Sequence, residues 1–181
     1  MEILLLSPHP SLIETFKMTD DRVVQTTAKV DTNFVKNFDW IVCYGYRHIL
    51  TKDVLDLVPA MNLHMSYLPW NRGADPNYWS WVDGTKKGYT IHLVDEGLDT
   101  GDILIRTEIP LEAKNETLAT SYNTITKHME DMFRQMWPAL RMNRIQGLPQ
   151  SYGNEKGSYH RSSEKPILLK GWDTPVKELI K

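Results

Sequence analysis

Three polar side chains in residues 62–102 have the types and spacing that acyl-transfer chemistry requires. Asn62 and His64 are two residues apart, so on an extended strand both side chains leave the same face. Asp99 lies in a glycine-flanked loop, directly after the alternating run 89–94, which is typical of a strand. One strand that carries Asn62 and His64 and a second strand that ends near Asp99 can therefore deliver all three side chains to one pocket.

This combination suits the attack of an amine on an activated acyl group. The carbonyl oxygen becomes an oxyanion as its carbon turns tetrahedral, and carboxamide and imidazole N–H groups are suitable donors for it. A carboxylate beside the imidazole orients the ring, raises its pKa and relays the proton that the amine loses. The residue types alone leave a structural alternative open, because an Asn-x-His pair on a strand and an Asp in a glycine turn often have only structural roles.

The elements that must position these residues alternate between strand and helix, and this order predicts a parallel α/β sheet with crossover helices. The expected strands are residues 3–6, 22–27, 39–44, 61–65, 89–94 and 103–109. The expected helices are residues 11–18, 31–38, 51–57, 76–81 and a long helix from 116 to about 138. Ser11 is the expected N-cap of the first helix, and Asn115 or Thr117 is that of the last one. Pro138 is expected to kink or end the last helix. Residues 66–75 are expected to form a loop.

The composition favours one soluble domain, residues 1–181, with an irregular tail from about residue 150. A formal charge of -2 gives no general attraction to nucleic acid or to an anionic membrane, so neither is expected as a partner. The single cysteine, Cys43, excludes an intramolecular disulfide and a cysteine-based zinc cluster, and no metal is expected. The first residues have neither the charge pattern of a signal peptide nor a run long enough to span a membrane, which predicts a cytoplasmic protein.

A series of short motifs extends this pattern across the central part of the chain. They are Asn62-Leu63-His64, Ser66-x-Leu68-Pro69, Arg72-Gly73-x-x-Pro76-x-x-Trp79, Gly88-x-Thr90-x-His92 and Gly97-x-Asp99-Thr100-Gly101-Asp102. In this order they resemble the formyltransferase family, which uses N10-formyltetrahydrofolate as the formyl donor. The resemblance implies a Rossmann-like formyltransferase fold, with a mostly parallel central sheet flanked by helices. The N-terminal part would be shortened, because only 61 residues precede Asn62.

The resemblance also implies roles for particular residues. Asn62, His64 and Asp99 match the catalytic Asn, His and Asp of the family. The folate is implied to bind against two segments, which consist of Arg47, His48, Ile49 and Leu50 and of Val94, Asp95, Glu96, Gly97 and Leu98. His92 is expected to have a structural role on its strand.

The tail motifs in 157–161 and 171–175 resemble compact sugar N-formyltransferases and the formylation domains fused to some peptide synthetases. The acceptor implied is the primary amine of a UDP- or dTDP-linked amino-deoxysugar, as in surface polysaccharide biosynthesis. Candidate acceptor contacts are aromatic residues that stack, cations that meet a diphosphate and polar residues that shape the pocket, namely His9, Ser66, Arg72, Trp79, Tyr159 and Arg161. For each of these residues packing or turn formation is the alternative.

Two departures from the family pattern bear on the acceptor. No glycine-rich phosphate loop follows the first strand, which argues against a phosphoribosyl amine. The chain also has no counterpart of the RNA-binding domain of methionyl-tRNA formyltransferase, and its charge does not replace one.

Other interpretations remain open at this point. Formyltransfer to another small amine, of aminoacyl or ribonucleotide type, or to water, as in a formyltetrahydrofolate hydrolase, keeps the family but changes the acceptor. A non-catalytic folate- or nucleotide-binding protein is a more remote alternative. The Asp99-Thr100-Gly101 triplet also occurs in aspartic proteases, but those are all-β proteins with paired carboxylates. The methionines of the long helix suit core packing or, alternatively, a homodimer interface.

Overall fold

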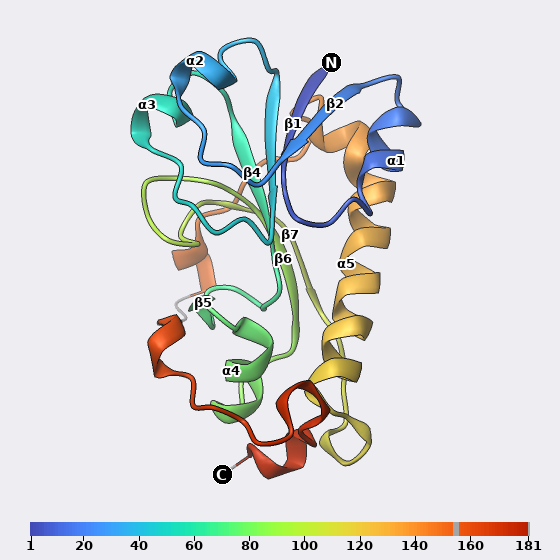
Figure 1. The fold of residues 1–181 in the computed structure, drawn as a ribbon, viewed down its shortest axis with the longest axis vertical. Helices are drawn as coiled ribbons and strands as arrows, with labels where there is room; N and C mark the ends of the chain where they lie inside the picture. Colours follow the sequence, from blue (N-terminus) through green and yellow to red (C-terminus); the bar gives the residue numbers. More distant parts are fainter. Residues whose placement is uncertain (154–155, 181) are drawn as a thin grey trace.

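A computed structural model describes residues 1–153 and 156–180 and shows a six-stranded sheet with helices on both faces (Figure 1). The sheet has the strand order β2-β1-β3-β4-β6-β7. Its strands are β1 (Glu2–Leu6), β2 (Arg22–Thr26), β3 (Trp40–Tyr44), β4 (Ala60–His64), β6 (Gly88–Leu93) and β7 (Ile103–Glu108). The α-helices are α1 (Ile13–Lys17), α2 (Thr32–Val35), α3 (Lys52–Leu55), α4 (Pro76–Val82) and α5 (Leu118–Leu140).

The direction of the strands changes in the middle of the sheet. β2, β1, β3 and β4 are parallel to one another, as the alternating order predicts. β6 is antiparallel to both β4 and β7. The sheet is therefore mostly parallel, as the family resemblance implies. β6 and β7 are the exception to the alternating order, since a loop as short as 94–102 can join only antiparallel neighbours, whereas parallel strands need a longer crossover.

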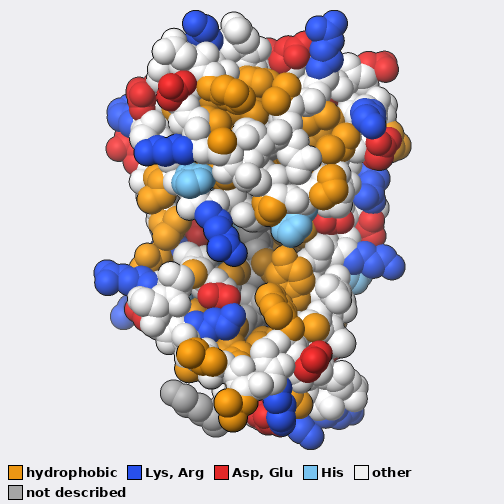
Figure 2. Space-filling view, in the orientation of Figure 1, with side chains coloured by type: hydrophobic (Ala, Val, Ile, Leu, Met, Phe, Trp, Pro, Cys, Tyr) orange, Lys and Arg blue, Asp and Glu red, His pale blue; other side chains and the backbone are white. Residues whose placement is uncertain are grey.

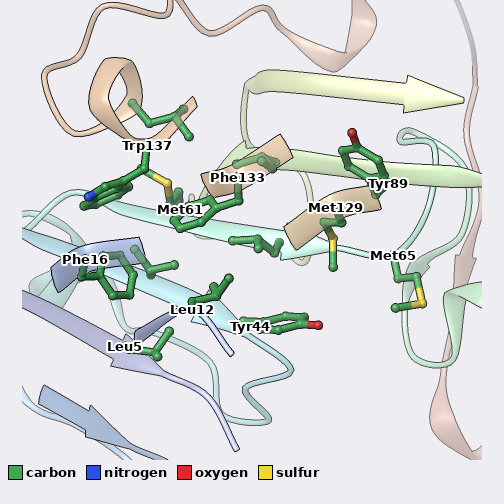
Figure 3. Packing of buried hydrophobic residues seen from close by; sticks show 14 of the residues in the cluster. Leu5, Leu12, Phe16, Tyr44, Met61, Met65, Tyr89, Met129, Phe133 and Trp137 are labelled. Carbon is green, nitrogen blue, oxygen red and sulfur yellow. The ribbon is translucent and has the colours of Figure 1, made fainter. Parts of the chain in front are cut away.

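Alternate side chains of the central strands feed two separate cores. In β1, Ile3 and Leu5 join the core beneath α1 and α5, whereas Leu4 and Leu6 join the core beneath α2 and α3. The first core is the larger one and is rich in aromatic rings from the two helices, including Phe16, Phe133 and Trp137 (Figure 3). Burial on both faces explains why the central strands read as continuous apolar runs rather than alternating ones.

The long helix α5 follows the predicted pattern, with Thr117, one of its two candidate caps, at the N-terminus. Thr117 caps its N-terminus in a capping box with Thr120, so the helix begins at Leu118. Pro138 lies inside the helix instead of ending it, and the buried side chains of Trp137 and Leu140 on either side anchor this last turn. The methionines of α5 pack in or against the main core, which agrees with the core-packing interpretation.

Two local expectations are wrong. Ser11 does not cap the first helix, because its hydroxyl donates to Glu130 of α5, and α1 begins only at Ile13. The segment 66–75 is not only loop, because β5 (Arg72–Gly73) pairs in parallel with β8 (Tyr159–His160) of the tail. Two-residue strands that meet across more than 80 positions leave no periodic signal in the sequence.

The remaining described part of the chain consists mainly of loops and 3-10 helices, and it lies around α4 at the lower end of the molecule (Figure 1). Val176 is fully buried there against Tyr78 and Trp81 of α4. The 3-10 helices are η1 (Ala113–Asn115), η2 (Gln150–Gly153), η3 (Ser162–Glu164), η4 (Gly171–Asp173) and η5 (Val176–Glu178). Among the described residues, none of the helices is long and apolar enough to cross a membrane.

Candidate active site

Strand β4 and the loop after β6 bring Asn62, His64 and Asp99 together. Nδ2 of Asn62 donates to Oδ1 of Asp99 at 3.1 Å, and Nδ1 of His64 lies 3.5 Å from Oδ2 of the same carboxylate. His64 and Asp99 are almost completely buried, with 6% and 9% of their side chains exposed. Because Asn62 and His64 are two residues apart on β4, both of their side chains reach the same carboxylate, that of Asp99.

The loop that presents Asp99 is fixed by hydrogen bonds from both sides. Within the loop, Oδ1 of Asp95 accepts from the backbone N–H of Gly97 and from the hydroxyl of Thr100. From outside, Nε2 of Gln150 donates to the backbone oxygens of Asp99 and Gly101. Asp99 itself has a φ of 54°, a left-handed conformation that Asp adopts more readily than bulky residues. The loop thus holds its carboxylate in a defined direction.

The carboxylate of Asp99 is stabilised in its ionised form. Burial alone would raise its pKa, but the neighbouring His64 and His92 rings and the backbone N–H of Gly73, which donates to Oδ2 at 2.8 Å, lower it well below the ordinary value. Gly73 belongs to β5, so the pairing of β5 with the tail strand β8 supports this donor. Asp99 is an acceptor and a negative charge throughout the neutral pH range.

The contact of Nε2 with a backbone oxygen determines the tautomer of His64. Nε2 lies 3.0 Å from the backbone oxygen of Asn71, which can only accept, so Nε2 carries the proton. In the neutral ring Nδ1 then has no proton and is a base beside Asp99. Burial lowers the pKa of His64 below its ordinary value, and the negative charge of Asp99 offsets only part of this effect. His64 is therefore neutral at pH 7.

His92 takes part in the same cluster, which its sequence position did not reveal. Nδ1 donates to the backbone oxygen of Leu93 at 2.7 Å, so Nε2 is free to accept, and Nδ2 of Asn62 lies 3.3 Å from it. Nε2 is also 3.5 Å from Oδ1 of Asp99. The predicted structural role thus extends to holding the carboxamide of Asn62. The antiparallel register that sets Asn62 opposite His92 is what brings them together.

The cluster opens into a cavity of about 840 Å³. One part of its wall contains His9, Arg47 and Leu98, and another contains Lys165 and Trp172 of the tail. Figure 2 shows the hollow across the middle of this face, with hydrophobic side chains and charges of both signs around it. This volume lies in the range of about 300–1,000 Å³ that is usual for ligand pockets.

The structure places the residues of the two predicted folate segments in different surroundings. Arg47 and Leu98 line the cavity. Leu50 is buried in the smaller core, and Ile49 is 71% exposed. The backbone N–H of Val94 donates to Ala60 of β4, which ties the second segment to the strand that carries Asn62. These contacts leave the folate assignments as predictions.

Of the six predicted acceptor contacts, only His9 lines the cavity within the part of the chain that the structure describes. The ring of Trp79 stacks on His160 at 4.0 Å between centroids, and Tyr159 covers Gly73. The hydroxyl of Ser66 donates to the backbone of Trp70. These contacts leave the acceptor assignments of the three side chains as predictions.

The remaining two acceptor candidates also have local roles. The guanidinium of Arg72 donates to the side chain of Gln150, which in turn holds the Asp99 loop. Arg161 is exposed, and its backbone N–H donates to Glu164. Lys165 and Trp172 of the cavity wall were not among the predicted contacts, although Trp172 belongs to the tail motif 171–175. No group of three or more His, Cys, Asp or Glu side chains is arranged to hold a metal ion within 1–153 and 156–180.

The fold and the site together define an α/β protein with an acid–base cluster at the edge of a ligand cavity. Comparison with known proteins gives the family, since the formyl transferase family profile matches residues 6–136. Methionyl-tRNA formyltransferase of Clostridium beijerinckii is 32% identical over 178 residues, which cover 93% of this chain and 53% of the relative. The chain belongs to the formyl transferase family. It spans about half the length of the curated relatives that it matches.

Solved structures agree with this membership. The formyltransferase PseJ from Anoxybacillus kamchatkensis, in complex with UDP-4,6-dideoxy-4-formamido-L-AltNAc and tetrahydrofolate, is 42% identical with a TM-score of 0.91. The match covers 99% of this chain and 98% of that chain. A sugar N-formyltransferase from Shewanella sp FDAARGOS_354 has a TM-score of 0.78 at 20% identity, covers 99% of this chain and 85% of its own, and shows the same fold.

Proposed function

We propose that the protein transfers a formyl group from N10-formyltetrahydrofolate to the primary amine of a nucleotide-linked amino-deoxysugar. The Asn62–His64–Asp99 cluster at the cavity carries this proposal. The likeness to PseJ over nearly the whole of both chains supports it, since that protein was crystallised with a UDP-linked formamido sugar and tetrahydrofolate. A single domain, residues 1–181, is the proposed catalytic unit.

His64 is the proposed base. The amine nitrogen attacks the formyl carbon, and Nδ1 of His64 takes the proton that this nitrogen loses. The carboxylate of Asp99, 3.5 Å from Nδ1, stabilises the imidazolium that forms. The backbone oxygen of Asn71 keeps the ring oriented in both protonation states, because Nε2 donates to it throughout. The protonated Nδ1 is then a donor toward the oxygen of the tetrahedral carbon. When this carbon becomes a carbonyl again, its bond to N10 of the folate breaks, and N10 takes up the proton that His64 had accepted, which releases tetrahydrofolate.

Asn62 is the proposed oxyanion donor, and the structure adds a condition to this role. Both N–H groups of its carboxamide have acceptors in the ligand-free cluster, Asp99 at 3.1 Å and His92 at 3.3 Å. One of these hydrogen bonds must be exchanged for the formyl oxygen. The bond to His92 is the longer one and its acceptor is uncharged, so it is the one we expect to break. The bond to Asp99 keeps the carboxamide in place.

Two other acceptors remain candidates for the same cluster. The curated relatives act as methionyl-tRNA formyltransferases, but this chain spans about half their length. Water in place of the amine would give a formyltetrahydrofolate hydrolase. Full-length likeness to PseJ favours the aminosugar over both.

Purified protein tests the proposal against these acceptors directly. N10-formyltetrahydrofolate would be incubated with UDP- and dTDP-linked aminosugars, glycinamide ribonucleotide, methionyl-tRNA or no acceptor, and the products followed by mass spectrometry. We expect a formylated nucleotide sugar from at least one acceptor and little release of tetrahydrofolate without one. Equal release with and without acceptor would identify a hydrolase, and formylation of methionyl-tRNA alone would refute the sugar assignment.

A further inference from the structure

The side chain of Gln150 joins two segments that both contact Asp99. Its amide nitrogen, Nε2, donates to the backbone oxygen of Asp99 at 2.8 Å and to that of Gly101 at 2.9 Å. Its amide oxygen, Oε1, accepts from Nε of Arg72 at 3.1 Å and from a terminal guanidinium nitrogen at 2.7 Å. Gln150 is only 7% exposed, so these hydrogen bonds are largely shielded from water. Both ends of the amide are therefore occupied by other parts of the chain.

The partners of this amide determine its orientation. A guanidinium can only donate and a backbone carbonyl can only accept, so Oε1 must face Arg72 and Nε2 must face the Asp99 loop. A glutamate of the same length would keep the acceptor for Arg72, but it would direct its second oxygen at two carbonyl oxygens. The contacts at this position thus require the donor that only the amide provides.

These hydrogen bonds complete a closed ring of contacts around Asp99. Arg72 directly precedes Gly73, whose backbone N–H donates to Oδ2 of Asp99 at 2.8 Å. One segment, β5, therefore holds the carboxylate of Asp99 through Gly73 and holds the backbone of the same residue through Arg72 and Gln150. A shift of Asp99 relative to β5 would break a hydrogen bond on one side of this ring or on the other.

The backbone of Asp99 depends on such support. Its φ of 54° lies in the left-handed region, and a residue other than glycine keeps this conformation only where the surrounding structure holds it. The segment that carries Gln150 is itself anchored, because Leu148 exchanges two backbone hydrogen bonds with Ile103 of β7, at 2.8 and 2.9 Å. Gln150 thus connects the Asp99 loop to the edge of the main sheet as well as to β5.

From this arrangement we infer that Gln150, held by Arg72, is a positioning residue for formyl transfer and acts through Asp99. It keeps the carboxylate 3.5 Å from Nδ1 of His64, where the carboxylate stabilises the imidazolium that forms as the amine loses its proton. Without Gln150 the carboxylate is still present but misplaced, so the loss falls on kcat and not on the binding of either substrate. This inference rests on the proposed function, but it is the same for every formyl acceptor.

A double-mutant cycle tests this role. kcat and KM for both substrates would be measured for the wild type, Gln150→Met, Asp99→Asn and the double variant, at enzyme concentrations high enough to follow the slow variants. Gln150→Glu is the second probe, because its carboxylate still accepts from Arg72 but cannot donate to the Asp99 loop. Gln146→Met is the matched control, since Gln146 is an exposed amide in the same segment. Thermal unfolding checks that each variant is folded.

We expect Gln150→Met to lower kcat by about ten- to a hundredfold, with both KM values changed by less than about twofold. Gln150→Glu should lose as much kcat, and Gln146→Met should lose none. In the Asp99→Asn background, Gln150→Met should lower kcat further by less than about twofold, because its effect passes through the carboxylate that is already absent.

In an active wild type, the inference fails alone if folded Gln150→Glu keeps the wild-type kcat, or if KM rises in place of a fall in kcat. Equal losses of kcat from Gln150→Met with Asp99 and with Asn at this position would also overturn it, because Gln150 would then contribute only to the general integrity of the fold. A wild type that releases no tetrahydrofolate with any acceptor would instead overturn the proposed function, and this inference with it.

Discussion

Nε2 of His64 donates to the backbone oxygen of Asn71 at 3.0 Å, and this one contact decides which nitrogen of the ring is chemically available. Since the carbonyl cannot donate, the neutral ring has its lone pair on Nδ1, on the side of Asp99. A backbone group in the loop after β4 thus prepares His64 as a base before any substrate binds.

The pH dependence of turnover follows from the burial of this ring. His64 must be neutral to accept a proton, and burial lowers its pKa below the ordinary 6.5. Activity is therefore retained as the pH falls to 6.5 and is lost only at lower pH, when the ring gains a proton. The measurement is kcat at saturating concentrations of both substrates between pH 5 and 9, because kcat/KM would also report the ionisation of the free acceptor amine. An acidic limb centred above pH 6.5 would contradict the assignment of His64 as the base.

Replacement of the carboxylate tests its part in proton uptake. Asp99→Asn should lower kcat by about a thousandfold, because an amide cannot stabilise the imidazolium of His64 as a carboxylate does. The loop should stay folded, since the asparagine oxygen still accepts from Gly73. Asp53→Asn, the same change on the exposed surface of α3, is the control and should keep full activity. A variant with more than half of the wild-type kcat would remove Asp99 from the mechanism.

Gly73 connects the tail to the carboxylate of Asp99. It has a φ of 89°, and a Cβ built there would lie 2.3 Å from the backbone oxygen of His160. Gly73→Ala should therefore separate β5 from β8, displace the donor to Asp99 and reduce both activity and melting temperature.

Gly84 provides the matched comparison for this substitution. It also has a positive φ, 62°, but a Cβ there meets no atom within 4 Å. Gly84→Ala should cost only about 1 kcal/mol of backbone strain and leave turnover unchanged. Thermal unfolding and steady-state kinetics on both variants decide the matter, and equal effects would show that Gly73 matters only for its backbone conformation.

The buried contacts of Asp21 lead to a separate prediction about the stability of the fold. Its side chain is fully buried and accepts from Trp137 of α5, with Arg141 at 3.1 Å. Asp21→Ala should lower the free energy of unfolding by about 3–5 kcal/mol, as the loss of one partner from a buried ion pair does. Glu14→Ala, which removes the exposed pair with Lys17, should change it by less than about 1 kcal/mol. Denaturant unfolding at pH 7 measures both.

The same residue gives a pH dependence of stability. Burial opposes ionisation of Asp21, but the ammonium group of Met1 and the donors Thr19 and Trp137 lower its pKa below 3.8. The stabilisation is present above pH 3.8 and is lost as the pH falls through the lower folded-state pKa. The difference in stability between wild type and Asp21→Ala should therefore shrink in this acidic range. A difference that stays constant down to pH 2 would exclude an ionised Asp21 as its cause.

Features that depend on neighbouring residues could be predicted from the sequence, whereas features that depend on long-range pairing could not. Apolar runs such as Ile3–Leu6 and the spacing of Asn62 and His64 reflect burial and strand period, so the central strands and the shared direction of these two side chains were predictable. The place of His92 depends on the register between β4 and β6, and that register is not visible in either strand alone. The tail contacts were also beyond reach, because β8 and Trp172 meet partners far away in the sequence.

The most direct test of the central claim follows a labelled formyl carbon. Formyl-labelled N10-formyltetrahydrofolate and a UDP-linked aminosugar would be mixed with wild type, Asn62→Ala or His64→Ala, each checked for an intact fold by thermal unfolding. We predict that the label appears on the sugar amine with wild type, and that both variants transfer it at least about a hundredfold more slowly. Transfer at the wild-type rate in folded His64→Ala, or a label that appears only as free formate, would contradict the account.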